Sequence, residues 1–122
     1  MKNISHNLGK QGEEIAKTHL ENGGYTILES NWRFKKYEID LIAQKTNTIA
    51  IIEVKARTGN AYGEPEDFVN KKKQQFLISA AHNYLVTKNC NLECRFDIIS
   101  ILIINNITTV KHIEAAFYPS LK

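Results

Sequence analysis

The chain has 122 residues, which is enough for one domain with a real hydrophobic core and too few for two. With 43% hydrophobic and 24% charged residues it has the composition of a globular protein, and no apolar run approaches the ~18 residues that would span a bilayer. The formal net charge of +3 is compatible with a nucleic-acid partner but does not require one. We therefore expect a single domain without a membrane partner.

The first half of the chain predicts one helix and three strands. Apolar residues at helical spacing indicate a helix over residues 6–22, which Gly23-Gly24 would end. Strands are expected over residues 25–32, 37–44 and 48–56. The last two are separated by the polar segment KTNT, which indicates a hairpin.

The second half predicts a loop, a helix and two more strands. Residues 57–67 contain two Gly, one Pro and no periodicity, which is typical of a mobile loop. Helical spacing returns over residues 68–88, and strands follow at 94–104 and 107–116 with a turn at Asn105-Asn106. The order α-β-β-β-α-β-β favours an α/β fold, a mixed β-sheet flanked by helices.

Two features of the sequence bear on the compartment. The N-terminus, MKNISHNLGKQGEE, lacks the apolar segment of a signal peptide. Cys90 and Cys94 could pair as a disulfide, but without further Cys or His partners they are better interpreted as two reduced thiols. We expect a cytoplasmic protein.

Charged residues interrupt two of the predicted strands. Glu53 and Lys55 are two positions apart at the end of an otherwise apolar strand, so their side chains share a face. Glu38 and Asp40 share a face of the preceding strand, and the hairpin can bring that face beside Glu53 and Lys55. Two or three carboxylates brought together would repel one another unless a counter-ion is present. A hard divalent cation with oxygen ligands, usually Mg²⁺, would neutralise them.

This arrangement predicts phosphoryl chemistry. Asp40 and Glu53 would hold Mg²⁺ or Mn²⁺, which polarises a phosphoryl oxygen and lowers the pKa of a bound water. Lys55 could orient that water and stabilise the charge that develops in the transition state. The alternative is a salt bridge between Lys55 and either Glu38 or Glu53 on a solvated face of the sheet.

At these positions the sequence resembles the PD-(D/E)XK nucleases. Ile39-Asp40 stands in the place of PD, and Glu53-Val54-Lys55, thirteen residues after Asp40, stands in the place of (D/E)XK. Nearly the whole chain resembles the YraN-like family of endonuclease-like proteins, which is itself similar to archaeal Holliday junction resolvases. The matching runs are GKQGEEIAKTHLENGGYTILESNWR, YEIDLIA, IEVKAR, KKKQQFLISAAHNYL, CRFDII and HIEAAF.

The resemblance implies a restriction-endonuclease-like domain over residues 1–122. It implies Asp40 and Glu53 as metal ligands, Lys55 as the catalytic lysine and the backbone carbonyl of Val54 as a further ligand.

Two helical residues border the apolar faces of their helices and are further candidates. In the resemblance, Glu13 occupies the position of an acid that completes the catalytic and metal site of related resolvases. Gln74 occupies the position of a glutamine that similar nucleases use near the catalytic lysine. The alternatives are an ordinary helix-surface carboxylate and a surface amide.

Basic residues flank the predicted site and could hold phosphate groups, with Trp32 and Phe34 adding stacking surface. These candidate nucleic-acid-binding residues are Arg33, Lys35, Lys36, Arg57 and Lys73. The alternative is a solvated lysine-rich surface.

Three functions fit the sequence. The first is a Mg²⁺-dependent nuclease that acts on DNA, in branched or damaged form, and the second is a non-catalytic nucleic-acid-binding module that kept the fold. The third is a small scaffold protein in which the charges form a structural network. Cutting both strands of a symmetric junction would suit a C2 homodimer.

Overall fold

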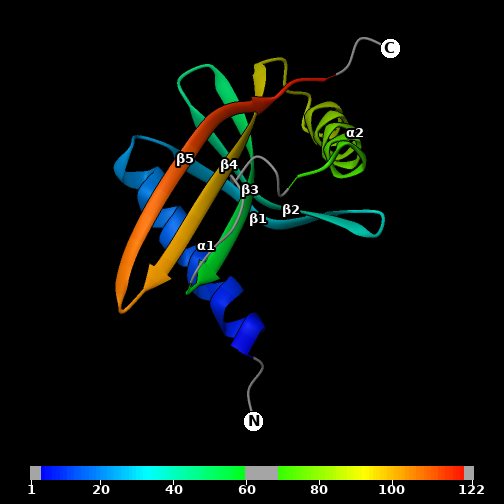
Figure 1. The fold of residues 1–122 in the computed structure, drawn as a ribbon. Helices are drawn as coiled ribbons and strands as arrows, with labels where there is room; N and C mark the ends of the chain where they lie inside the picture. Colours follow the sequence, from blue (N-terminus) through cyan, green and yellow to red (C-terminus); the bar gives the residue numbers. More distant parts are fainter. Residues whose placement is uncertain (1–3, 60–68, 120–122) are drawn as a thin grey trace.

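The computed structural model of the chain describes residues 4–59 and 69–119, with side chains from Asn7 onward. Two helices and five strands lie in this part of the chain, in the predicted order (Figure 1). They are α1 (Ile4–Asn22), β1 (Thr26–Phe34), β2 (Tyr37–Lys45), β3 (Thr48–Thr58), α2 (Lys71–Thr87), β4 (Glu93–Ile104) and β5 (Ile107–Phe117).

The strands form one sheet in the order β1-β2-β3-β4-β5. β3 and β4 are parallel, and the other neighbouring pairs are antiparallel. A parallel pair needs a crossover connection, and α2 lies in that connection. Figure 1 shows α1 and α2 on opposite faces of the sheet. The predicted α/β fold with a mixed sheet is confirmed, and it is consistent with a restriction-endonuclease-like architecture.

The core has two parts, one on each face of the sheet, and β3 contributes to both. Ile49 and Ile51 belong to the cluster that α2 covers, whereas Ala50 and Ile52 belong to the cluster that α1 covers. This alternation follows from the two-residue period of a strand. It explains why the central strand reads as a continuous apolar run until Glu53.

Several predicted boundaries were wrong by a few residues. β3 continues to Thr58, so Arg57 is in a strand and not in the predicted loop. The second helix begins at Lys71 rather than at residue 68, because Asn70 caps it by accepting a hydrogen bond from the Lys73 amide at 2.8 Å. Residues 60–67 of the predicted loop lie outside the described residues.

Two further observations concern the helices and the cysteines. Neither α1 nor α2 is long and apolar enough to cross a bilayer. Cys90 and Cys94 are free thiols, as predicted.

α1 crosses β3 at very short range. A Cβ atom added to Gly12 would lie 2.6 Å from the Cβ of Ala56, a separation that real Cβ atoms do not tolerate. Glycine at this position therefore lets the helix backbone reach the sheet, and it brings the next residue, Glu13, toward the charged end of β3.

Candidate active site

The central feature of the site is the place where β2 and β3 stop pairing. Their antiparallel ladder runs from Lys45 and Thr48 to Leu41 and Ile52. Beyond that pair β2 continues beside β1, and β3 continues beside β4. Asp40 lies at the separation, and its Oδ2 accepts a hydrogen bond from the backbone N–H of Val54 at 2.8 Å. A carboxylate thus satisfies a backbone donor of β3 where the ladder ends.

Glu53 lies on the other side of this separation and is almost completely buried, with 4% of its surface exposed. Its Oε2 is 3.6 Å from Lys55 Nζ and 3.2 Å from Lys73 Nζ. Its Oε1 is buried and has no hydrogen-bond partner among the described residues. The salt bridge between Glu53 and Lys55, which was the predicted alternative, is therefore present. The predicted solvated face is wrong, because Glu53 is buried.

The surroundings of Asp40 disfavour its ionised form. Burial, and then the negative charge of Glu53, raise its pKa from the usual 3.8 to about 7. The hydrogen bond from Val54 and the positive charge of Lys73 act in the opposite direction without cancelling the effect. At neutral pH the metal-free site therefore holds two neighbouring carboxyl groups, and burial together with the charge of Glu53 disfavours ionisation of Asp40.

An open cleft of about 640 Å³ adjoins Asp40. It is lined by Gly9, Lys10, Glu13, Asn31, Glu38, Asp40 and Val54. Within it, Asn31 Nδ2 donates a hydrogen bond to Glu13 Oε1 at 2.9 Å. The structure therefore brings Glu13 into the same cleft as Asp40. Asn31 was not among the residues predicted from the sequence, and its positive φ of 54° is apparent only in the structure.

The donor set fits a Mg²⁺-like cation that takes two ligands from the protein. Glu53 Oε1 has no hydrogen-bond partner among the described residues, and the pKa of Asp40 is raised by its burial and then by the charge of Glu53. In the described part of the chain no three His, Cys, Asp or Glu residues gather closely enough to form a complete metal site. Glu38, for example, pairs with Arg33 at 3.6 Å. Mg²⁺ at phosphoryl-transfer sites is commonly held by one or two carboxylates plus waters and phosphate oxygens, so Asp40 and Glu53 suffice.

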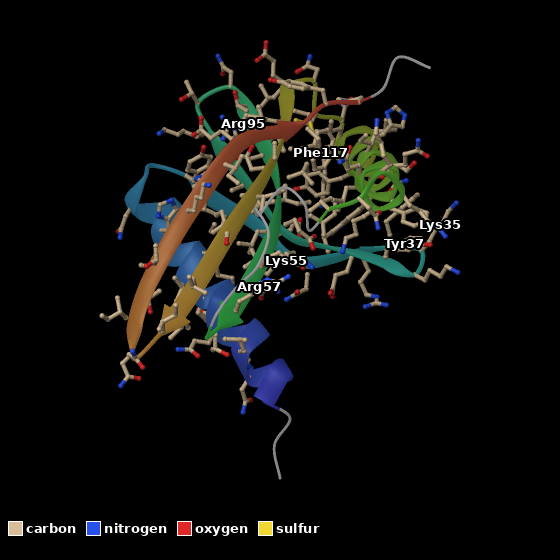
Figure 2. All side chains as sticks on the ribbon, viewed as in Figure 1. Lys35, Tyr37, Lys55, Arg57, Arg95 and Phe117 are labelled. Carbon is tan, nitrogen blue, oxygen red and sulfur yellow. The ribbon has the colours of Figure 1, made fainter. Side chains whose placement is uncertain are left out.

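Other residues of the predicted site lie on β3 and at the start of α2. Lys55 and Arg57 lie two positions apart on the part of β3 that extends beyond its pairing with β2 (Figure 2). The amide of Gln74 donates to the backbone carbonyl of Val69 at 3.0 Å, so this side chain supports the start of α2. Lys73 was predicted as a phosphate contact, and in the structure it forms an ion pair with Glu53.

The β1–β2 hairpin carries the remaining basic candidates. Lys35 and Lys36 occupy its turn, with their ammonium groups 5.3 and 5.9 Å from the ring centroids of Phe34 and Tyr37 (Figure 2). Trp32 and Phe34 are half-buried and pack against the core beneath α2, so less of their ring surface faces solvent than the sequence suggested.

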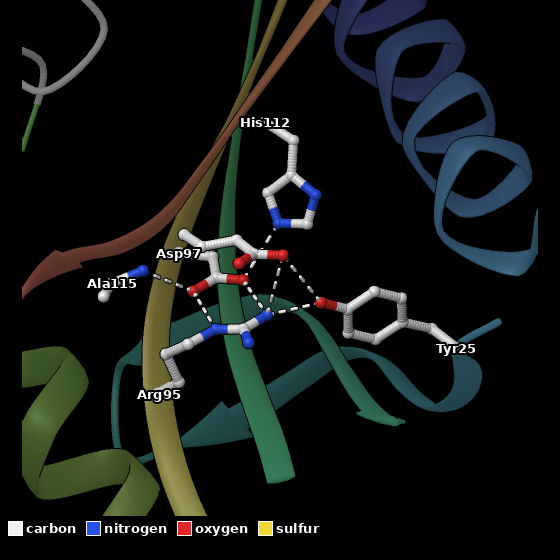
Figure 3. A network of polar contacts seen from close by, with 6 residues as sticks. Tyr25, Arg95, Asp97, His112 and Ala115 are labelled. Carbon is white, nitrogen blue, oxygen red and sulfur yellow. Dashed lines mark hydrogen bonds and ion pairs between the residues drawn. The ribbon is translucent and has the colours of Figure 1, made fainter. Parts of the chain in front are cut away.

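A second polar cluster, which was not predicted from the sequence, lies around Asp97. Asp97 has no exposed surface, and it accepts hydrogen bonds from Arg95 at 2.8 Å, from the Ala115 amide at 3.0 Å and from His112, whose Nε2 lies at 2.9 Å (Figure 3). Arg95 also donates to the Tyr25 hydroxyl. Burial alone would raise the pKa of Asp97, but the hydrogen bonds outweigh burial and hold it below its usual range. The cluster joins β4, β5 and Tyr25, the residue that precedes β1.

Comparison with known proteins identifies relatives over most of the chain. The model of the uncharacterised protein family UPF0102 matches residues 12–101. A UPF0102 protein of Flavobacterium psychrophilum is 46% identical over 114 residues, which cover 93% of this chain and 96% of that protein. A UPF0102 protein of Chlorobium chlorochromatii is 43% identical over 123 aligned positions, covering 95% of each chain.

Proposed function

The chain belongs to the UPF0102, or YraN-like, family, which is related to the PD-(D/E)XK nucleases, and we propose that it is a divalent-cation-dependent nuclease that hydrolyses phosphodiester bonds in DNA. The observation that carries this proposal is the separation of β2 and β3, where half-buried Asp40 and buried Glu53 lie close to each other and Lys55 pairs with Glu53. A purely structural ion pair would not need a second, half-buried carboxylate whose pKa is raised to about 7.

The residues have separable roles in this proposal. Asp40 and Glu53 would hold Mg²⁺ or Mn²⁺, which when bound supplies charge neutralisation at the phosphoryl group and a more acidic water. The Val54 N–H fixes one oxygen of Asp40 and leaves the other for the cation. Glu13, held by Asn31, borders the cleft from α1 and would accept a hydrogen bond from water near the phosphate.

Lys55 is the proposed catalytic lysine. Its side chain is 34% exposed and its Nζ is 3.6 Å from Glu53 Oε2, so the ammonium contacts the buried carboxylate and is open to a phosphate bound beside it. In hydrolysis a water would give up a proton to bulk solvent and attack phosphorus, while the bond to the leaving sugar oxygen breaks and that oxygen takes up a proton from solvent. An ammonium beside the phosphate stabilises the added negative charge. Lys35, Lys36 and Arg57 would neutralise neighbouring phosphates.

The test is Lys55→Ala, measured for cleavage and stability together. We expect the variant to keep its fold and its Mn²⁺ binding, and to cleave branched, nicked and linear DNA about 10²-fold more slowly than the wild type. Lys45→Ala is the control, because Lys45 is an exposed lysine at the opposite turn of β2. Equal cleavage by wild type and Lys55→Ala would contradict the catalytic role. DNA binding by the wild type without cleavage on this panel would instead favour a binding module.

A further inference from the structure

Two ammonium groups contact the same oxygen of Glu53, and the nuclease motif accounts for only one of them. Lys55 belongs to the motif and lies on the same strand as Glu53. Lys73 enters from the first turn of α2, and its Nζ is the closer of the two, at 3.2 Å against 3.6 Å. The carboxylate thus has one more positive partner than the proposed chemistry requires.

Lys73 also acts on the second carboxylate of the site. Its positive charge lowers the pKa of Asp40, against the effect of Glu53. The ammonium of Lys73 therefore lies within the field of both carboxylates that would hold a cation. It satisfies them incompletely, because Glu53 Oε1 remains without a hydrogen-bond partner in the described part of the chain.

The two partners differ in how easily they can leave this contact. Glu53 is 4% exposed and cannot reach water without disrupting β3, whereas the side chain of Lys73 is 41% exposed. A lysine side chain is long and flexible, and its ammonium is strongly hydrated once it is released. Entry of a divalent ion would place two further positive charges beside Lys73, and Coulomb repulsion would then move the lysine and leave the carboxylate in place.

We propose that Lys73 is an internal counter-ion that occupies the cation position at Glu53 in the metal-free protein and is displaced when a divalent cation binds. The proposal rests on the proposed function for the identity of the two metal-binding carboxylates. If the paired state is favoured about tenfold over the open state, the apparent affinity for the metal is weakened about tenfold, because only the open state is competent to bind.

The experiment is a calorimetric titration of Mn²⁺ into metal-free wild type and Lys73→Met. Methionine keeps the aliphatic stem of the side chain and removes its charge. We expect Lys73→Met to bind Mn²⁺ about tenfold more tightly than the wild type. Lys72→Met is the matched control, because it removes the same charge from the adjacent, exposed position of α2 and should change the affinity about twofold at most.

Thermal unfolding supplies a second readout that does not depend on metal. Without Mn²⁺, Lys73→Met should melt several degrees below the wild type, because buried Glu53 has lost its nearer counter-ion. With saturating Mn²⁺ this difference should disappear. Lys72→Met should melt with the wild type in both conditions.

Three results would overturn the proposal. They are an unchanged or weaker Mn²⁺ affinity in Lys73→Met, an equal gain in Lys72→Met, and no Mn²⁺ binding by either the wild type or Lys73→Met. None of them involves cleavage, so a protein that binds Mn²⁺ as described but cuts no DNA would refute the nuclease proposal and leave the role of Lys73 supported.

Discussion

Replacing Asp40 by asparagine should make the metal-free protein more stable. The pKa of Asp40 lies at about 7 in the fold and near 3.8 in an unfolded chain, which corresponds to about 4 kcal/mol by which ionised Asp40 disfavours folding. Asparagine removes the charge and keeps an oxygen for the Val54 N–H. Because Asp40 is not fully removed from water, we expect about half of this value, about 2 kcal/mol, or about 6 °C in melting temperature.

The pH dependence identifies the cause. Between pH 3.8 and about 7 the unfolded chain has released the Asp40 proton while the folded chain retains it, so wild-type stability should fall as the pH rises through this window. Asp40→Asn lacks this loss. The difference between the two proteins should therefore be small near the lower limit, widen through the window and become constant above about pH 7.

The assay is urea unfolding in a chelator over this pH range, followed by the same series with Mn²⁺. Mn²⁺ should stabilise the wild type and have little effect on the variant, because ligands that bind only the native state stabilise it. Glu38→Gln is the control: it removes a carboxylate that lines the same cleft but pairs with Arg33 at the surface, and should change stability by less than about 1 kcal/mol. A variant less stable than the wild type above pH 7, or a difference independent of pH, would refute the reasoning.

Two further substitutions test the packing. Gly12→Ala should lower the free energy of unfolding by about 1–3 kcal/mol, because its methyl group would lie 2.6 Å from the Cβ of Ala56. The double variant Gly12→Ala, Ala56→Gly should recover this stability, and no recovery would contradict the proposed close approach. Asp97→Asn should lower the free energy of unfolding by about 3 kcal/mol, because Arg95 loses its buried counter-ion. The control is Glu114→Gln, at an exposed carboxylate 3.7 Å from Arg95, and it should cost less than about 1 kcal/mol. Equal losses of the two variants in chemical unfolding would contradict the burial argument.

The fold was predictable because its signals are local. The apolar run at Ile49–Ile52 requires a strand covered on both faces, and two helical patterns are available to cover it. Element boundaries were less predictable, because they depend on single hydrogen bonds such as the Asn70 cap of α2.

The candidate site was predictable only in part. Asp40, Glu53 and Lys55 stand out because charges in apolar strands need an explanation. The contact of Lys73 with Glu53 could not be derived from spacing, because it depends on how α2 is placed over the sheet. The sequence gives no local sign of the hydrogen bond between Glu13 and Asn31 either, because it joins a helix to a strand distortion.

The Asp97 cluster was missed for a similar reason. The register of β4 and β5 shifts between Phe96 and Ile98, and Ala115 has a positive φ of 52°. This irregularity turns the Ala115 amide toward Asp97. Neither Asp97 nor His112 has a local pattern that would reveal the contact.

The separation of β2 and β3 also affects the mobility of the lysine proposed for catalysis. From Glu53 to Thr58, the pairing of β3 within the described residues is along one edge, with residues 98–103 of β4. That part of β4 pairs on its other side with β5, which is the edge strand and is joined to it by the turn at Asn105 and Asn106, both with positive φ. The order of Lys55 therefore depends on two successive ladders, and local opening of the exposed β5 edge would increase its motion without altering any residue of the cleft.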